Sequence, residues 1–219
     1  MKLYGYWRSS ATYRVRIALA LKGIEYEIVP VHLLEGGGQQ HADAFKALNP
    51  MSQVPVLEVQ EGTKTVELAQ SIAIFEYLEE AYPRPALLPA DPVLRARARQ
   101  LTEIVNSGIQ PLQNLSVLQR LKEHGVDGTA WMQHFIRRGL AAYQAIAETT
   151  AGKLSVGDQP TFADCALIPQ LYGARRNAID VEAEFPLLAR IDAACSELPA
   201  FQAAHPDRQP DAQPAPETR

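Results

Sequence analysis

Two neighbouring serines near the N-terminus are the side chains best placed to do chemistry in this sequence. Ser9 and Ser10 follow a short apolar segment, residues 2–6, and precede a segment with helical character, residues 13–22. At such a strand-to-helix junction, the unpaired N–H groups and the positive dipole end of the helix bind anions. Hydroxyl donors there favour a thiolate over a thiol, since a helix N-terminus lowers a thiol pKa. One serine can instead be a plain N-cap, and both roles can coexist.

Two further motifs lie where main-chain groups can be offered to a ligand. At Val54-Pro55, which leads into an apolar segment, a cis peptide would turn the Val54 main chain outward towards an extended peptide. The alternative is a trans proline on an edge strand. Gln70 and Ser71 precede another helical segment, where Ser71 is either an N-cap or part of a helix end that faces a carboxylate. Two helix ends and a bared backbone edge suit a short anionic peptide.

These motifs must be positioned by strands and helices that alternate in the first half of the chain. The predicted strands are residues 2–6, 25–31, 54–59 and 64–68, and the predicted helices are 13–22, 42–48 and 72–81. Glu61-Gly62-Thr63 predicts a hairpin turn between the last two strands. Such an order implies a partly parallel sheet with helices packed on it.

A proline-rich segment, residues 83–92, predicts a linker to a half of different character. Helices are predicted there at 93–121, 129–149, 161–177, 186–195 and 198–204. Pro111 is expected to bend or break the first of them. The predicted domains are therefore 1–82 (α/β), 83–92 (linker), 93–210 (all-α) and a polar disordered tail, 211–219.

Two features of the helical half bear on capping and charge. Thr161-Phe162-Ala163-Asp164 has the form of a capping motif before an apolar helix, so we interpret it as structural. Arg176, near the end of the same helix, either complements the helix dipole or clamps a substrate carboxylate with its planar fork. Arg8, beside the two serines, is a candidate for the same clamp.

The composition argues against several classes of function. The formal net charge is -4 and basic residues are interspersed with acidic ones, which disfavours nucleic acid as a partner. Cys165 and Cys195 form no Cys-x-x-Cys motif and the histidines are scattered, so no metal site is predicted. No stretch approaches ~20 apolar residues, and the N-terminus lacks a signal-peptide pattern. Free thiols suit a reducing compartment, so we expect a cytoplasmic protein without a membrane partner.

Several motifs in the same order resemble one known family. Residues 9–19, Ser-Ser-Ala-Thr-Tyr-Arg-Val-Arg-Ile-Ala-Leu, resemble the zeta-class signature Ser-Ser-Cys-x-Trp-Arg-Val-Arg-Ile-Ala-Leu. Further matches are residues 37–40, 47–55, 70–71 and 109–116. From residue 1 to about Pro210 the chain resembles the cytosolic glutathione transferases, most of all the zeta-class maleylacetoacetate isomerases. The resemblance implies an α/β thioredoxin-like N-terminal domain followed by an all-α helical-bundle domain.

The resemblance also implies glutathione as the cofactor, a homodimer, and roles for matching residues. Ser9 and Ser10 would be catalytic, with Ser9 hydrogen-bonded to the glutathione thiolate and Ser10 assisting at the same helix end. Other glutathione contacts would come from Gln40, Val54 before a cis Pro55, Gln70, Ser71, Gln110, Asn114 and Ser116. Arg8 and Arg176 would bind substrate carboxylates.

One departure from the family limits the mechanism, and several substrates stay open. Ala11 stands where the family often has Cys, so a protein thiol there is excluded, whereas chemistry on glutathione's own sulfur is not. Tyr13 replaces a family Trp. The implied activity is cis–trans isomerisation of maleylacetoacetate by reversible thiolate addition. Maleylpyruvate is the nearest alternative, although related sequences have Arg where this chain has Leu115-Ser116. General transferase activity on α-halo acids, or a binding protein without catalysis, are further alternatives.

Overall fold

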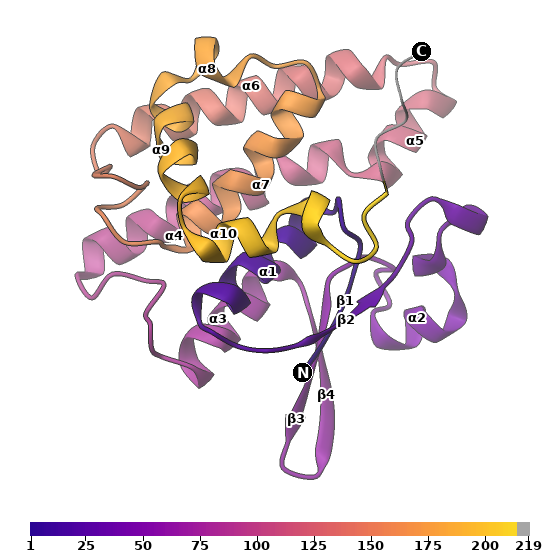
Figure 1. Ribbon diagram of the computed structural model, residues 1–219. Helices are drawn as coiled ribbons and strands as arrows, with labels where there is room; N and C mark the ends of the chain where they lie inside the picture. The colour runs from indigo at the N-terminus through magenta and orange to yellow at the C-terminus, as the bar shows by residue number, and fades with distance from the viewer. Residues whose placement is uncertain (214–219) are drawn as a thin grey trace. The chain divides into compact units, whose positions relative to one another are not determined.

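The computed structural model describes residues 1–213, which form two compact units (Figure 1). The first unit is Met1–Pro85 together with the segment that begins at Pro199, and the second is Ala86–Leu198. Most of the predicted disordered tail, residues 214–219, lies outside the described residues. Within residues 1–213, every helix is too short or too polar to span a bilayer.

A four-stranded mixed sheet forms the centre of the first unit. Its strands are β1 (Lys2–Gly5), β2 (Glu27–Pro30), β3 (Val56–Glu61) and β4 (Lys64–Ala69), in the order β2-β1-β3-β4. β1 and β2 are parallel, which requires a crossover between them, whereas β3 is antiparallel to both its neighbours. Glu61 pairs with Lys64, so the turn has two residues, and Gly62 has the positive φ of 63° that such hairpins require. The predicted partly parallel sheet and hairpin are confirmed.

Helices α1 (Ser10–Leu21), α2 (Asp43–Leu48) and α3 (Ser71–Ala81) complete the N-terminal part of this unit. α1 is the crossover between β1 and β2, and every residue from Thr12 to Leu19 is buried. It packs against α3, and its buried face includes two charged side chains, Arg14 and Arg16. A buried guanidinium requires hydrogen-bond partners, so these two arginines must organise the groups around them.

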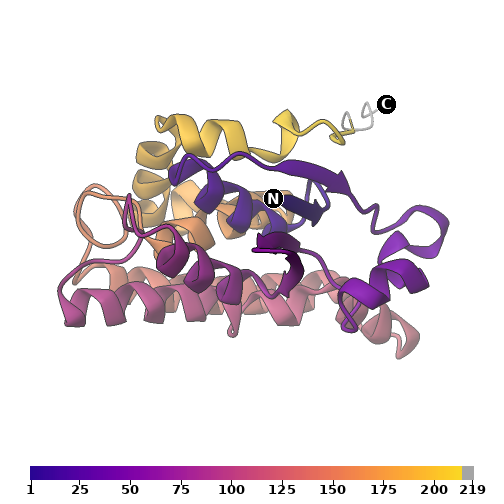
Figure 2. The same cartoon turned by 90° about the horizontal axis from the view of Figure 1, so that it is seen from below.

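The last helix, α10 (Pro199–Ala204), packs against α1 and belongs to the first unit. Figures 1 and 2 both show it, in yellow, alongside α1, in indigo. Phe201 and Ala204 are buried, and Arg16 donates from Nε to the Ala204 carbonyl at 3.0 Å. The predicted all-α domain, 93–210, includes this segment, because a helical pattern does not reveal which unit buries the apolar face of a helix.

The second unit is all helical. Its helices are α4 (Pro92–Asn106), α5 (Leu115–Glu123), α6 (Gly128–Ala147), α7 (Phe162–Arg176), α8 (Val181–Glu184) and α9 (Pro186–Ser196). The predicted helix 93–121 is broken into α4 and α5 by a 3-10 turn, Gln110–Gln113, that contains Pro111, as expected. α8 was not predicted.

The N-terminus of α7 carries the capping motif expected from the sequence. Thr161 and Asp164 form a capping box, in which the Asp164 carboxylate accepts from the Thr161 N–H at 2.8 Å. The same carboxylate accepts from the Ser155 N–H at 2.9 Å, and Tyr143 donates to the Ser155 hydroxyl at 2.8 Å. Burial raises the pKa of the Asp164 carboxyl, while these donors oppose that shift. The motif is therefore structural.

Candidate active site

Ser9 lies where β1 gives way to α1 and is the N-cap of that helix. Its main-chain N–H donates to the Tyr6 carbonyl at 3.0 Å, which closes a turn, and its Oγ accepts from the Thr12 N–H at 3.2 Å. α1 begins at Ser10, three residues earlier than predicted, so Ser10 occupies the first helical position. Both serines are partly exposed. The capping role of Ser9 is confirmed, and its hydroxyl hydrogen stays available to a ligand.

The N-terminus of α3 differs from the expectation for Ser71. Gln70, not Ser71, is the N-cap, and its side chain does not cap the helix. Ser71 is 4 % exposed, and its Oγ accepts from Nη1 of buried Arg14 at 3.3 Å. A helix N-terminus with a cation behind it favours a bound carboxylate. Arg14 lies within the motif at residues 9–19, but nothing local in the sequence signals its contact with Ser71.

The backbone of Gln70 is the other unusual feature of this helix end. Gln70 is exposed and has φ 70° and ψ 113°, a region that residues other than glycine rarely adopt. Such a conformation costs about 1–3 kcal/mol and is found most often at ligand-binding positions. This observation agrees with a binding role for Gln70 without assigning a ligand.

The Val54-Pro55 peptide is cis, which is the first of the two alternatives that the sequence leaves open. The ladder between β3 and β4 begins only at Val56, which pairs with Ala69. Within residues 1–213 the Val54 main chain has no hydrogen-bond partner, although its neighbour Gln53 is held through its carbonyl by Asn49 at 2.7 Å. The Val54 N–H and C=O can therefore pair with an added extended peptide.

Gln40 is buried next to the glycine run. Its Nε2 donates to the Leu33 carbonyl at 3.3 Å, whereas its Oε1 is buried and has no partner among the described residues. A buried acceptor left unpaired costs about 1–3 kcal/mol, so a donor from a ligand is its natural partner. Gly38 has φ 99°, and a Cβ there would collide with the Gln40 amide. The glycine is thus needed to place Gln40.

Arg8 is partly buried beside the serines. Its Cζ lies 4.7 Å from the centroid of the Trp7 ring, and Nη2 donates to the Tyr6 hydroxyl at 3.4 Å. In the described part of the chain Arg8 forms no ion pair. Most of its donors are therefore open to an anionic substrate.

Two predicted ligand contacts of the second unit are occupied by local capping. Asn114 is the N-cap of α5, and its Oδ1 accepts from both the N–H and the hydroxyl of Ser116 at 3.2 Å. Gln110 begins the 3-10 turn before α5. Contacts of these three side chains with a ligand stay a prediction.

The two arginines at the end of α7 have different surroundings. Arg175 forms salt bridges with Glu182 at 2.6 Å and Asp192 at 2.7 Å. Arg176 is exposed, lies 5.8 Å from the Tyr172 ring centroid, and has no ion pair within residues 1–213. Of these two arginines, only Arg176 therefore has a guanidinium that can bind a substrate carboxylate.

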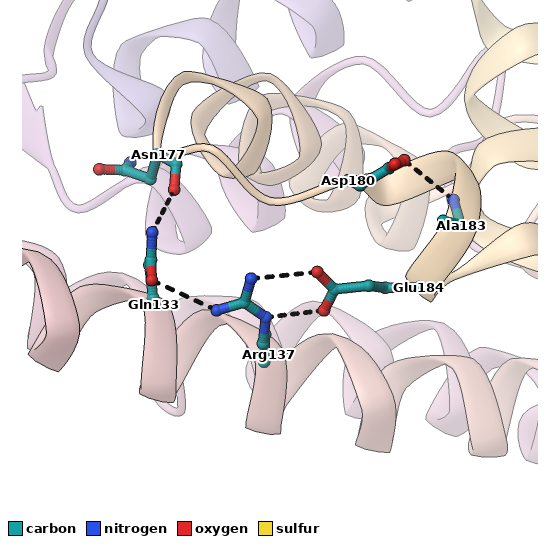
Figure 3. A network of polar contacts seen from close by, with 6 residues as sticks. All are labelled: Gln133, Arg137, Asn177, Asp180, Ala183 and Glu184. Carbon is teal, nitrogen blue, oxygen red and sulfur yellow. Dashed lines mark hydrogen bonds and ion pairs between the residues drawn. The ribbon is translucent and has the colours of Figure 1, made fainter.

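A polar network fixes the chain that follows Arg176 (Figure 3). Gln133 of α6 donates to the Asn177 carbonyl at 2.9 Å, and Arg137 binds both Glu184 oxygens, at 2.7 and 3.0 Å. Asp180 caps α8 by accepting from the Ala183 N–H at 3.0 Å. An open pocket of about 570 Å³ lies on the same face of α6, but none of the predicted site residues lines it.

Comparisons with known proteins identify the family of this chain. Residues 1–80 match the family model "Glutathione S-transferase, N-terminal domain". Maleylacetoacetate isomerase of Rattus norvegicus is 48 % identical over 95 % of this chain and 94 % of its own length. A crystal structure of maleylacetoacetate isomerase from Anaeromyxobacter dehalogenans 2CP-1, with bound GSH in the active site, is 55 % identical, covers 97 % of both chains and has a TM-score of 0.89.

A second solved structure extends the comparison to another substrate name. It is a maleyl pyruvate isomerase, described as a bacterial glutathione S-transferase in the zeta class, and is 46 % identical with a TM-score of 0.90. The match covers 97 % of this chain and 100 % of that one. This chain therefore belongs to the glutathione S-transferase family, in the zeta-class group that contains the maleylacetoacetate isomerases.

Proposed function

We propose that this protein is a glutathione-dependent cis–trans isomerase of maleylacetoacetate-type cis-enediketo acids. One observation carries the proposal: within a single compact unit, the sequence builds two helix N-termini and a free main-chain edge. Ser9 caps the first helix, Ser71 with Arg14 lies at the second, and Val54 provides the edge. A thiol, a carboxylate and an extended backbone are the groups that glutathione offers to these three places.

The residues of the first unit fit glutathione by a further test. The Gln40 Oε1 is a buried acceptor without a partner among the described residues, and the Val54 main chain is unpaired. Both are satisfied by a peptide with N–H and C=O groups. In the relative from Anaeromyxobacter dehalogenans, GSH is bound in the active site.

The chain's own groups would hold the sulfur anionic and orient the substrate. When bound, glutathione supplies a sulfur that adds reversibly to the conjugated alkene, so that the former double bond can rotate. The Ser9 hydroxyl donates towards that sulfur while its oxygen keeps the Thr12 N–H, and the dipole of α1 favours the negative charge. Arg8 and Arg176 bind substrate carboxylates, and Arg8 stabilises the enolate charge that develops during addition.

Maleylpyruvate isomerisation is the second candidate function. It is favoured by the 46 % identity to the solved maleyl pyruvate isomerase. The chemistry is the same and maleylpyruvate is the shorter substrate. The residues around the N-cap of α5 therefore determine which of the two substrates is preferred.

We also propose that the enzyme is a cytoplasmic homodimer, since both cysteines are free thiols and zeta-class relatives share its architecture.

A direct assay tests the proposed function. Purified protein is mixed with maleylacetoacetate, with and without glutathione, and formation of the trans isomer and loss of free thiol are followed together. We expect glutathione-dependent isomerisation without net loss of thiol. Glutathione binding without isomerisation of either maleylacetoacetate or maleylpyruvate would reject the isomerase and leave conjugation of α-halo acids to be measured.

A further inference from the structure

The turn that leads to Ser9 at the start of α1 contains a residue, Trp7, whose main-chain N–H and C=O are bound by side chains. The turn runs from Tyr6 to Ser9 and is closed by the Ser9 N–H on the Tyr6 carbonyl. Trp7, inside it, is 5 % exposed and lies beyond the last paired residue of β1, Gly5. Neither the strand ladder nor the main chain of α1 therefore satisfies the Trp7 amide and carbonyl, and water has little access to them.

Two side chains, one from α1 and one from the C-terminal segment, bind these groups. The buried Arg16 donates from Nη2 to the Trp7 carbonyl at 2.9 Å and from Nε to the Ala204 carbonyl at 3.0 Å. Asp211, 204 residues along the chain, accepts from the Trp7 N–H at 3.0 Å through Oδ2. The C-terminal segment thus contacts the Tyr6–Ser9 turn in two ways. Ala204 does so through Arg16, and Asp211 does so directly.

The C-terminal segment has a third contact near the same turn. Gln213 and His32 approach through their side-chain nitrogens at 3.3 Å, and the His32 ring meets the Tyr6 ring edge-on at 5.1 Å. His32 itself is held by the main chain, since its Nδ1 accepts from the Glu35 N–H at 2.8 Å. The segment around Asp211 is therefore held on the N-terminal side by the Ala204 contact and on the C-terminal side by the Gln213 contact.

We propose that Asp211 is a positioning residue for the thiolate site: by binding the Trp7 N–H, it fixes the turn that places Ser9 at the start of α1. This inference rests on the proposed function, because it assumes that the thiol of glutathione lies at Ser9. A thiolate site depends on geometry, and displacements of about 1 Å at such sites can cost as much as 100-fold in rate. Asp211 touches neither the serine nor the reacting atoms and acts through Trp7.

The experiment compares three variants with a readout that mere stability does not move. Asp211→Ala removes the acceptor, Asp211→Asn keeps an oxygen acceptor without the charge, and Asp207→Asn alters an exposed carboxylate of the same segment. The pKa of bound glutathione is measured from the ultraviolet absorbance of its thiolate, with kcat and KM for the isomerisation. We expect Asp211→Ala to raise that pKa and lower kcat about tenfold, as the loss of a hydrogen bond to a charged group implies. Asp211→Asn and Asp207→Asn should stay within about threefold of wild type.

Two results would overturn the inference. A lower melting temperature of Asp211→Ala, with thiol pKa and kcat unchanged, would show that the contact only stabilises the fold. Equal losses in Asp211→Asn and Asp211→Ala would show that charge matters rather than the Trp7 hydrogen bond. If Asp211→Ala does not fold, Asp211→Ser replaces it, because its shorter side chain withdraws the acceptor from Trp7.

Ser9→Ala separates failure of the inference from failure of the proposed function. A raised thiol pKa in Ser9→Ala, with none in Asp211→Ala, rejects only the positioning role. An unchanged thiol pKa in Ser9→Ala rejects the thiolate site itself, and with it the basis of the inference.

Discussion

At the scale of single residues, capping and chemistry use different parts of the same hydroxyl. Ser9 accepts the Thr12 N–H with its oxygen lone pair, and its hydrogen can still be donated to a sulfur anion. Ser10, at the first helical position, accepts no helix N–H in the described structure. The two serines are adjacent in sequence but unequal in role.

Replacing each serine tests this inequality. Ser9→Ala should lower kcat by about 100-fold, as the loss of a single preorganised donor to a developing anion does. It should also cost about 1 kcal/mol of stability through the lost cap. Ser10→Ala should lower kcat much less and leave stability nearly unchanged. Steady-state kinetics and thermal denaturation measure both effects, and the reverse ranking would transfer the thiolate role to Ser10.

The two arginines at the end of α7 provide a matched pair for substrate binding. Arg176→Gln should raise KM for the dicarboxylate substrate about tenfold, the cost of one charge-assisted contact, and leave KM for glutathione unchanged. Arg175→Gln should instead lower the melting temperature, because Arg175 is held by Glu182 and Asp192. Kinetics with each substrate varied in turn measure the difference. Equal KM values for Arg176→Gln and wild type would remove Arg176 from the site.

At the scale of elements, features that depend on neighbouring residues could be predicted from the sequence, whereas features that depend on distant contacts could not. The Gly62 hairpin, the break near Pro111 and the Thr161–Asp164 capping box depend on neighbouring residues, and all three are confirmed. The packing of α10 on α1 and the burial of Gln40 depend on residues far away in the chain. Periodicity and turn chemistry contain no information on such partners.

The capping box of α7 should be worth far more than an exposed cap. Asp164→Ala leaves the buried N–H groups of Ser155 and Thr161 without an acceptor, at about 1–3 kcal/mol each. We expect a loss of about 3 kcal/mol in the free energy of unfolding, measured in urea. The control is Asp127→Ala, which removes the exposed N-cap of α6 and should cost only about 1 kcal/mol. Similar losses for both variants would show that burial adds nothing to the cap.

The Arg137–Glu184 pair should make stability depend on pH in a defined window. Hydrogen bonds from Arg137 lower the pKa of Glu184 below its ordinary value of 4.5. The folded state then binds the Glu184 proton less readily than the unfolded state does, so the contribution of the pair is present above pH 4.5 and is lost as the pH falls through the lowered pKa. The melting temperature of wild type should exceed that of Glu184→Gln at neutral pH, and the gap should close in acid. A gap that persists at low pH would assign the effect to packing instead.

At the scale of the whole molecule, the second unit is inserted between two parts of the first. Met1–Pro85 and the segment from Pro199 belong to one unit, so the chain must return after Leu198 to complete it. Arg16 links the two parts, since its buried guanidinium donates to the Ala204 carbonyl. The stability of the glutathione-binding unit therefore depends on residues near the end of the chain.

Two truncations separate the structural part of this returning segment from its positioning part. A chain that ends at Leu198 lacks α10, leaves the Arg16 Nε without its acceptor, and exposes the surface that Phe201 covers. Removing the acceptor of a buried donor costs about 1–3 kcal/mol, and more for a charged donor, and the exposed apolar surface adds to this loss, so this chain should fail to fold stably or to bind glutathione. A chain that ends at Gln209 keeps α10 and the Ala204 contact but loses Asp211, so it should bind glutathione and isomerise slowly. Circular dichroism and glutathione titration distinguish the two. If the chain that ends at Leu198 is as stable as the one that ends at Gln209, α10 is not needed to complete the first unit.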